Sequence, residues 1–167
     1  MTKTLLILRH AKSSWKNEKL KDFDRPLKHR GEEDARLMGK VLRMTELVPQ
    51  VILSSPALRA KQTAELVARE AELAGELRFI DTFYLGEPED YINGLKQLPD
   101  EIERVMIVGH NPGLTRLLSF LTGRDVGNLP TCAVACVDFD LPSWKGACEG
   151  SGTLSYLDSP GDRVSKV

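Results

Sequence analysis

Short apolar runs alternate with segments of helical periodicity along the first three quarters of the chain. Uninterrupted apolar residues at 5–8, 51–53 and 105–108 predict strands that are buried on both faces, as in a parallel sheet, and 77–80 predicts a further short strand. Between these runs, apolar residues recur at the three- and four-residue spacing of amphipathic helices. The helices expected on this basis lie at 31–45, 57–71, 87–98 and 114–121.

The C-terminal part has a different pattern. Segments 133–139 and 152–157 read as two strands separated by a turn region that contains Pro142. The whole pattern predicts one domain over 1–160 and a loose tail at 161–167. Because strands and helices alternate, the expected fold class is α/β: three α/β/α layers, with a mostly parallel central sheet, helices on both faces and a C-terminal edge hairpin.

The segment from Ala11 to Lys28 is polar and irregular. Pro26 disfavours helical backbone at Arg25, so the segment is not expected to be one helix. A connection of this length within a compact domain is usually a functional loop or a disordered one. Since it directly follows the first predicted strand, we interpret it as a functional loop.

Composition restricts the partners and the compartment. The chain has 167 residues, 41% of them hydrophobic, and a net charge of −1. Without a global positive field, neither nucleic acid nor an anionic membrane is an expected partner. The three cysteines, an odd number, do not form a disulfide framework and are expected to be apolar fillers. The first apolar run is too short for a secretory signal and no run reaches membrane-spanning length, so the expected location is the cytoplasm.

Basic side chains stand where three predicted strands end. The first strand leads into Arg9 and His10, the second is followed by Arg59, and the third is followed by His110. If these strands are parallel, their carboxyl ends share one edge of the sheet and the four side chains converge there. Guanidinium groups match phosphate oxygens in a bidentate manner, and backbone N–H groups at the helix start near Gly113 add to such an anion site.

The same four residues predict phosphoryl chemistry. A neutral imidazole can attack phosphorus with one ring nitrogen while a hydrogen bond to the other fixes the tautomer. We therefore predict His10 as the nucleophile and expect Arg9, Arg59 and His110 to bind the phosphate. A single strand-end histidine is more often structural, and a single helix arginine is usually solvated; the convergence of three strands favours the functional interpretation. Neither a metal ion nor another cofactor is expected, because the positive side chains neutralise the phosphate.

Four motifs in the same order resemble those of the histidine phosphatase superfamily, also called the phosphoglycerate-mutase-like fold. These motifs are Arg9-His10-Ala11, Arg25-Pro26-Leu27 with Gly31, the segment 54–64 around Arg59, and Val108-Gly109-His110-Asn111-Pro112. The resemblance covers about residues 4–122. It implies that His10 is phosphorylated during turnover and that Arg9, Arg59 and His110 form the phosphate pocket.

The small size and the segments Arg9–Ser13 and Gly109–Pro112 resemble SixA-type phosphohistidine phosphatases more than mutases. This implies a hydrolase acting on a phosphate-bearing substrate, with a histidine-phosphorylated signalling protein as the favoured partner. Two alternatives remain open. One is a general small-molecule phosphomonoesterase of the same fold, and the other is a non-catalytic module that binds phosphate.

Other candidate residues carry two interpretations each. Glu87 is our choice for the proton donor, although acidic residues also favour the start of an exposed helix. Ser14 and Asn17 either bind phosphate or cap a turn. Trp15 and Trp144 serve either in packing, which we favour, or as platforms for the substrate. Asp24 either orients Arg25 or holds the loop. His29 is expected to be exposed. Asn111 either helps to place His110 or serves only as a turn residue.

Overall fold

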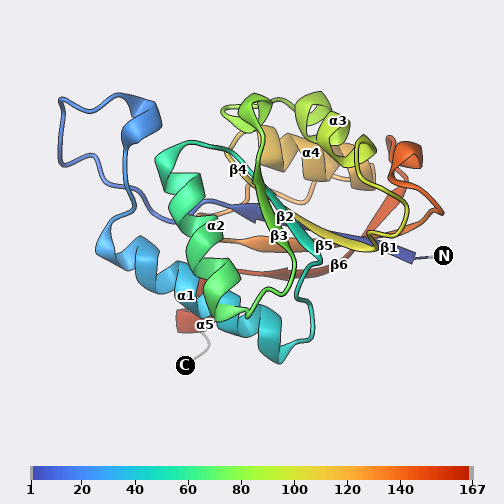
Figure 1. The fold of residues 1–167 in the computed structure, drawn as a ribbon, viewed down its shortest axis with the longest axis horizontal. Coiled ribbons are helices and arrows are strands. Elements are labelled where there is room, and N and C mark those ends of the chain that lie inside the picture. The colour runs from blue at the N-terminus through green and yellow to red at the C-terminus, as the bar shows by residue number, and fades with distance from the viewer. Residues whose placement is uncertain (1, 166–167) are drawn as a thin grey trace.

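The computed structural model describes residues 2–165, in which one six-stranded sheet lies between two pairs of helices (Figure 1). The strand order across the sheet is β3-β2-β4-β1-β5-β6. The strand bounds are β1 Thr2–Arg9, β2 Val51–Ser54, β3 Glu76–Phe79, β4 Arg104–Gly109, β5 Val134–Asp140 and β6 Gly152–Asp158. This is the predicted α/β fold.

The direction of the strands brings three strand ends to one edge. β1 pairs in parallel with β4, and β4 pairs in parallel with β2, which also pairs in parallel with β3. The register places Arg9 opposite Gly109 and Ser54 opposite Val108, so β1, β4 and β2 end at nearly the same level. β5 runs antiparallel to β1, and β6 closes the sheet as the predicted edge hairpin.

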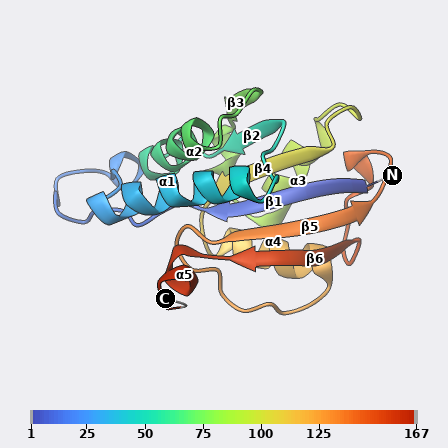
Figure 2. The ribbon, with the colours of Figure 1, turned by 90° about the horizontal axis from the view of Figure 1, so that it is seen from below.

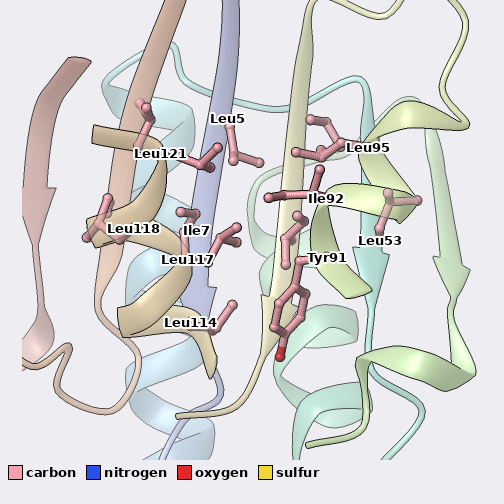
Figure 3. Packing of buried hydrophobic residues seen from close by; sticks show 14 of the residues in the cluster. Leu5, Ile7, Leu53, Tyr91, Ile92, Leu95, Leu114, Leu117, Leu118 and Leu121 are labelled. Atoms are coloured by element: carbon pink, nitrogen blue, oxygen red, sulfur yellow. The ribbon is translucent and has the colours of Figure 1, made fainter. Parts of the chain in front are cut away.

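Helices cover both faces of the sheet (Figure 2). α1 (His29–Met44) and α2 (Leu58–Glu70) pack on one face, while α3 (Pro88–Lys96) and α4 (Gly113–Thr122) pack on the other. Successive residues of a strand point to opposite faces. Leu5 and Ile7 accordingly join the α3 and α4 side chains (Figure 3), and Leu6 and Leu8 join those of α1 and α2.

Burial on both faces explains why the strands read as continuous apolar runs. Leu5, Leu6 and Ile7 are fully buried. Each such side chain contributes about 1.5–3 kcal/mol to the hydrophobic stabilisation. The strand that delivers the candidate nucleophile is therefore among the most firmly packed elements of the molecule.

The prediction of a loose C-terminal tail is wrong for residues 161–165, which belong to a helix. The expected loose segment 161–167 begins within a short helix, α5 (Pro160–Ser165). The guanidinium of Arg163 pairs with the buried carboxylate of Asp158, at 2.5 Å, and this contact ties α5 to the end of β6. Residues 166–167 lie outside the described part of the chain.

The segment between β1 and α1 leaves the body of the protein beyond the carboxyl ends of the strands (Figure 1). It contains a short helical turn, Asp22–Asp24, and a bridge between Ser13 and Leu27 that closes it at its base. A Cβ atom at Gly31 would collide with the carbonyl oxygen of Lys12, so glycine permits α1 to start directly against the loop. We refer to residues 12–28 as the β1–α1 loop.

Among residues 2–165, no helix is both long and apolar enough to cross a membrane.

Candidate active site

His10 lies just past the end of β1 and is almost completely buried. Its backbone N–H donates to the carbonyl of Gly109 (3.1 Å), which ties it to β4. The ring Nδ1 lies 2.8 Å from the carbonyl oxygen of Ala11. A carbonyl oxygen only accepts hydrogen bonds, so Nδ1 carries the proton and Nε2 keeps its lone pair.

The protonation state of His10 suits a nucleophile. Burial, together with the positive charges of Arg59 and Arg9, lowers the pKa of His10 to about 4, against the opposing effect of the hydrogen bond to Ala11. At neutral pH the imidazole is therefore uncharged.

His110 follows β4 and packs beside His10, with 5.3 Å between the ring centroids. Its Nε2 lies 2.8 Å from Oγ of Ser55, which follows β2 and is itself fully buried. The backbone N–H of Ala57 donates to the same Oγ (3.2 Å). We assign the Ser55 hydroxyl as the donor to Nε2, because no other acceptor for its proton is found among the described residues. This arrangement puts the ring proton of His110 on Nδ1, a buried atom that has no hydrogen-bond partner among the described residues.

Burial lowers the pKa of His110 to about 3, with the charges of His10 and Arg59 acting in the same direction. Near neutral pH the imidazole of His110 is thus uncharged, and its Nδ1 is enclosed beside His10. Its main chain is fixed by the fully buried Tyr91, whose hydroxyl accepts from the His110 backbone N–H (3.2 Å).

Two guanidinium groups hold fixed positions next to His10. Arg9 donates through Nη1 to the carbonyl of Leu129 (2.9 Å), while its buried Nε has no partner in the described structure. Arg59, the second residue of α2, is 4% exposed. It donates through Nη1 to the carbonyl of Asp22 (2.8 Å) and through Nη2 to the Asp22 carboxylate (3.0 Å).

The residues at this edge surround a cavity of about 320 Å³. Its lining consists of Arg9, His10, Lys12, Ser13, Trp15, Arg25, Lys28, Arg59 and Thr131. Five of these nine side chains are cationic, and none of the nine is a carboxylic acid. The structure thus brings Arg9, His10 and Arg59 together around one space, with His110 packed behind His10. Among the described residues no group of three or more potential ligands is placed to hold a metal ion.

Comparison with known proteins agrees with this architecture. The model of the histidine phosphatase superfamily (branch 1) matches residues 5–82. An uncharacterised chloroplast protein of Arabidopsis thaliana is 32% identical over 161 residues, which cover 91% of this chain and 73% of the relative. The chain belongs to the histidine phosphatase superfamily.

Solved structures show the same fold within the superfamily. The structure of the protein histidine phosphatase SixA with tungstate superimposes with a TM-score of 0.83 at 26% identity, covering 96% of this chain and 99% of SixA. A structure from Agrobacterium tumefaciens assigned to SixA gives a TM-score of 0.82 at 27% identity, with 95% and 98% coverage. These matches extend over nearly the whole length of both partners.

Glu87, the predicted proton donor of this superfamily member, is not placed in the cavity. It precedes α3 as its N-cap and forms a capping box with Asp90, whose carboxylate accepts from the Glu87 backbone N–H (2.8 Å). Its side chain is 59% exposed and lies 3.4 Å from the guanidinium of Arg116. The alternative interpretation, an acidic residue at an exposed helix start, describes this position.

Ser14 and Asn17 line a neighbouring hollow of the β1–α1 loop rather than the cavity beside His10. The Ser14 hydroxyl accepts from the backbone N–H of Lys16 (3.1 Å), and the Asn17 side chain accepts from that of Lys19 (3.1 Å). Both side chains therefore cap turns of the loop, the second of the two interpretations, and neither lines the cavity beside His10.

Sequence reasoning missed Asp22, the residue that organises the loop side of the site. Its carboxylate accepts from Arg25 (3.0 Å), Arg59 (3.0 Å) and the hydroxyl of Tyr84 (2.7 Å). Burial alone would raise the pKa of Asp22, but these three hydrogen bonds outweigh it and lower the pKa to about 2. Asp22, and not Asp24, is therefore the anionic partner of Arg25.

Arg25 and Trp15 form the outer wall. Arg25 is 6% exposed, and its guanidinium donates to the Ser13 hydroxyl (2.6 Å) and the Ser14 carbonyl (3.1 Å). Its central carbon lies 3.2 Å from the centre of the Trp15 ring, in a cation–π contact. Trp15 is 74% exposed, so the expectation of a packing role was wrong there. Trp144, in contrast, is fully buried as expected.

The remaining two predictions concern turns and surfaces. His29 is exposed, as expected, and pairs with Glu33 on α1 (2.7 Å). Asn111 anchors the segment before β5: its amide donates to the Leu129 carbonyl (2.9 Å), and its oxygen accepts from Thr115 at the start of α4. Because Arg9 donates to the same Leu129 carbonyl, Asn111 fixes a neighbour of the phosphate cavity rather than His110 directly.

Proposed function

We propose that this superfamily member is a phosphatase that works through a covalent phosphohistidine on His10, and that its substrate is phosphohistidine on a protein. The observation that carries the proposal is the state of His10. Its imidazole is neutral, Nδ1 donates to the Ala11 carbonyl, and Nε2 remains free beside Arg9 and Arg59. Binding of an anion alone has no need for a neutral imidazole held in this tautomer.

The reaction takes place in two displacements. In the first, Nε2 of His10 attacks phosphorus, the P–N bond to the substrate imidazole breaks, and the leaving imidazole retains or takes up a proton from water. In the second, water attacks phosphorus from the side opposite Nε2, which releases inorganic phosphate and restores the lone pair. Arg9 and Arg59 neutralise the phosphoryl oxygens. The ring of His110 packs behind that of His10 and supports its position.

The carboxylates near the site favour a leaving group that can depart without a proton from a general acid. An alkoxide must receive a proton from a general acid as it departs. With a pKa of about 2, Asp22 is ionised and cannot act as that acid near neutral pH, and Glu87 is engaged with Arg116 outside the cavity. The imidazole of phosphohistidine is a better leaving group and can be protonated beforehand. The likeness to SixA, named as a protein histidine phosphatase, supports the same choice.

The proposal is tested by comparing kcat/KM on a phosphohistidine protein with kcat/KM on a panel of small phosphomonoesters. We expect the phosphohistidine protein to be the better substrate. His10→Ala is expected to lose turnover by on the order of 10⁴-fold or more while still binding inorganic phosphate. Higher kcat/KM on the monoesters would favour a general phosphomonoesterase, and turnover that survives in His10→Ala would exclude the covalent mechanism.

A further inference from the structure

Two lysines line the phosphate cavity in addition to the residues that bind the phosphoryl group. Lys12 and Lys28 both border the space of about 320 Å³ that holds His10. Backbone contacts keep them side by side, since the Lys28 N–H donates to the Lys12 carbonyl (3.0 Å) and Gly31 packs against that carbonyl. Within the described residues, neither ammonium group takes part in an ion pair.

Positive charge is concentrated on this side of the molecule. Residues 9–30 contain eight Lys or Arg and three Asp or Glu residues, a net charge of +5, whereas the whole chain has a net charge of −1. Charge of one sign on the walls of a cleft raises the local concentration of oppositely charged ligands. The field around the cavity is therefore much stronger than the composition of the chain suggests.

One phosphoryl group cannot neutralise all of the positive charge around the cavity. It carries at most two negative charges, and Arg9 and Arg59 already face it across from His10. Arg25 is matched by the Asp22 carboxylate (3.0 Å). Lys12 and Lys28 are left as two cations on the same wall with no anion assigned to them.

We propose that Lys12 and Lys28 form a second anion subsite, so that the preferred substrate presents a carboxylate or a second phosphate next to the phosphoryl group that His10 receives. The proposal rests on the proposed function and adds to it a substrate class. On a phosphoprotein, the second anion is an Asp or Glu side chain that flanks the phosphohistidine. On a small molecule, it is a further acidic group of the same compound.

The first experiment compares matched substrates that differ only in the second anion. One pair consists of phosphohistidine peptides flanked by Glu or by Gln, and the other of 4-carboxyphenyl phosphate and phenyl phosphate. The test variant is Lys12→Gln with Lys28→Gln. The matched control is Lys40→Gln with Lys96→Gln, which makes the same charge change at exposed positions of α1 and α3.

We expect the wild type to favour the acidic member by about fivefold in kcat/KM, as two partly solvated ion pairs would give. The ratio should fall to about one in the Lys12/Lys28 variant and stay near five in the control. Preference within the peptide pair alone assigns the anion to a protein side chain, and preference within the small-molecule pair alone assigns it to a small phosphate. A ratio of one for both pairs in the wild type overturns the subsite.

A binding measurement keeps this proposal separate from the proposed function. Calorimetry gives the affinities for inorganic pyrophosphate and inorganic phosphate, which differ by a second phosphoryl group, without any need for turnover. We expect the ratio of these affinities to fall about fivefold in the Lys12/Lys28 variant relative to the control. An unchanged ratio overturns the subsite, whereas absent turnover with a lowered ratio overturns only the proposed enzymatic activity.

Discussion

The sheet edge and the β1–α1 loop both contribute to the same cavity, but they are built in different ways. His10 and His110 stand at the ends of buried strands, and their ring positions are fixed by the Ala11 carbonyl and the Ser55 hydroxyl. The loop instead presents exposed Lys12, Trp15 and Lys28. Asp22 joins the loop to the edge, where its carboxylate pairs with the buried Arg59 and accepts from the hydroxyl of Tyr84.

This difference assigns separate tasks to the two regions. Groups that take part in bond breaking need positions held to a fraction of an ångström, which rigid strands and buried hydrogen bonds supply. Groups that recognise a variable leaving group can lie on a loop above a rigid scaffold. We therefore expect substitutions at the edge to act on the rate of phosphoryl transfer, and substitutions in the loop to act mainly on the choice of ligand.

Arg59→Ala should lower the rate of phosphoryl transfer more than any substitution of Ser55, Asp22 or Glu87. It removes a 4% exposed guanidinium that faces the phosphoryl group, and loss of one charge-stabilising donor costs about 10²–10³-fold in kcat. Steady-state kinetics on phosphohistidine measure the loss. Arg36→Ala on the outer part of α1 is the control and should change kcat less than twofold. Equal effects of the two variants would mean that Arg59 does not face the phosphoryl group.

The buried histidines make stability depend on pH. The pKa of His10 is about 4 in the folded state and about 6.5 when unfolded, so the unfolded state binds more protons between these values. The stabilisation is complete above pH 6.5 and is lost as the pH falls toward 4. Going from pH 7 to pH 5 should cost about 2 kcal/mol through His10 alone. Urea unfolding checks this, since His10→Gln should lose about 2 kcal/mol less than the wild type over the same interval.

Ser55→Ala should lower kcat about tenfold, the value of one hydrogen bond that fixes the tautomer of His110. Nitrogen NMR of the ring distinguishes this from a loss of packing. In the wild type Nδ1 of His110 should be protonated and Nε2 unprotonated at pH 7. A ring protonated at Nε2 in the wild type would contradict the assignment, whatever the kinetic effect of the substitution.

Asp22→Asn should strengthen the binding of inorganic phosphate. It removes a negative charge that pairs with Arg25 and Arg59, two of the cations that line the cavity. Loss of this repulsion should raise the affinity for phosphate about threefold in a water-like dielectric. Asp24→Asn is a matched control, because it makes the same charge change two residues away at an exposed position. Calorimetry should show the gain for Asp22→Asn alone, and weaker binding would show that Asp22 is needed mainly to position Arg59.

Glu87→Gln should have the smallest effect, less than twofold in kcat/KM on phosphohistidine. Its side chain is 59% exposed and paired with Arg116, and such surface pairs contribute little. The same variant is assayed on phenyl phosphate. An equal and large loss on both substrates would return Glu87 to the role of general acid.

The sequence was sufficient for the parts of the site that lie at the ends of buried strands. Arg9, His10 and His110 follow apolar runs whose burial on both faces is visible in the sequence, and a parallel sheet brings such ends together. Asp22 and Ser55 could not be found in this way. Asp22 acts on Arg59, 37 positions further along the chain, because the loop folds back. For Glu87 the sequence was ambiguous in another way. An acidic residue at a helix start can be a cap or a proton donor, and the structure shows it as the N-cap of α3.

The central claim, a covalent intermediate on His10, is tested most directly by acid-free rapid quenching during turnover, followed by mass spectrometry of the peptide that contains His10. We predict a phosphoryl group on Nε2 of His10 that is stable to base, labile to acid, and absent from His10→Ala. Single turnovers in which no phosphoenzyme forms, while phosphate is released at the full rate, would contradict the account.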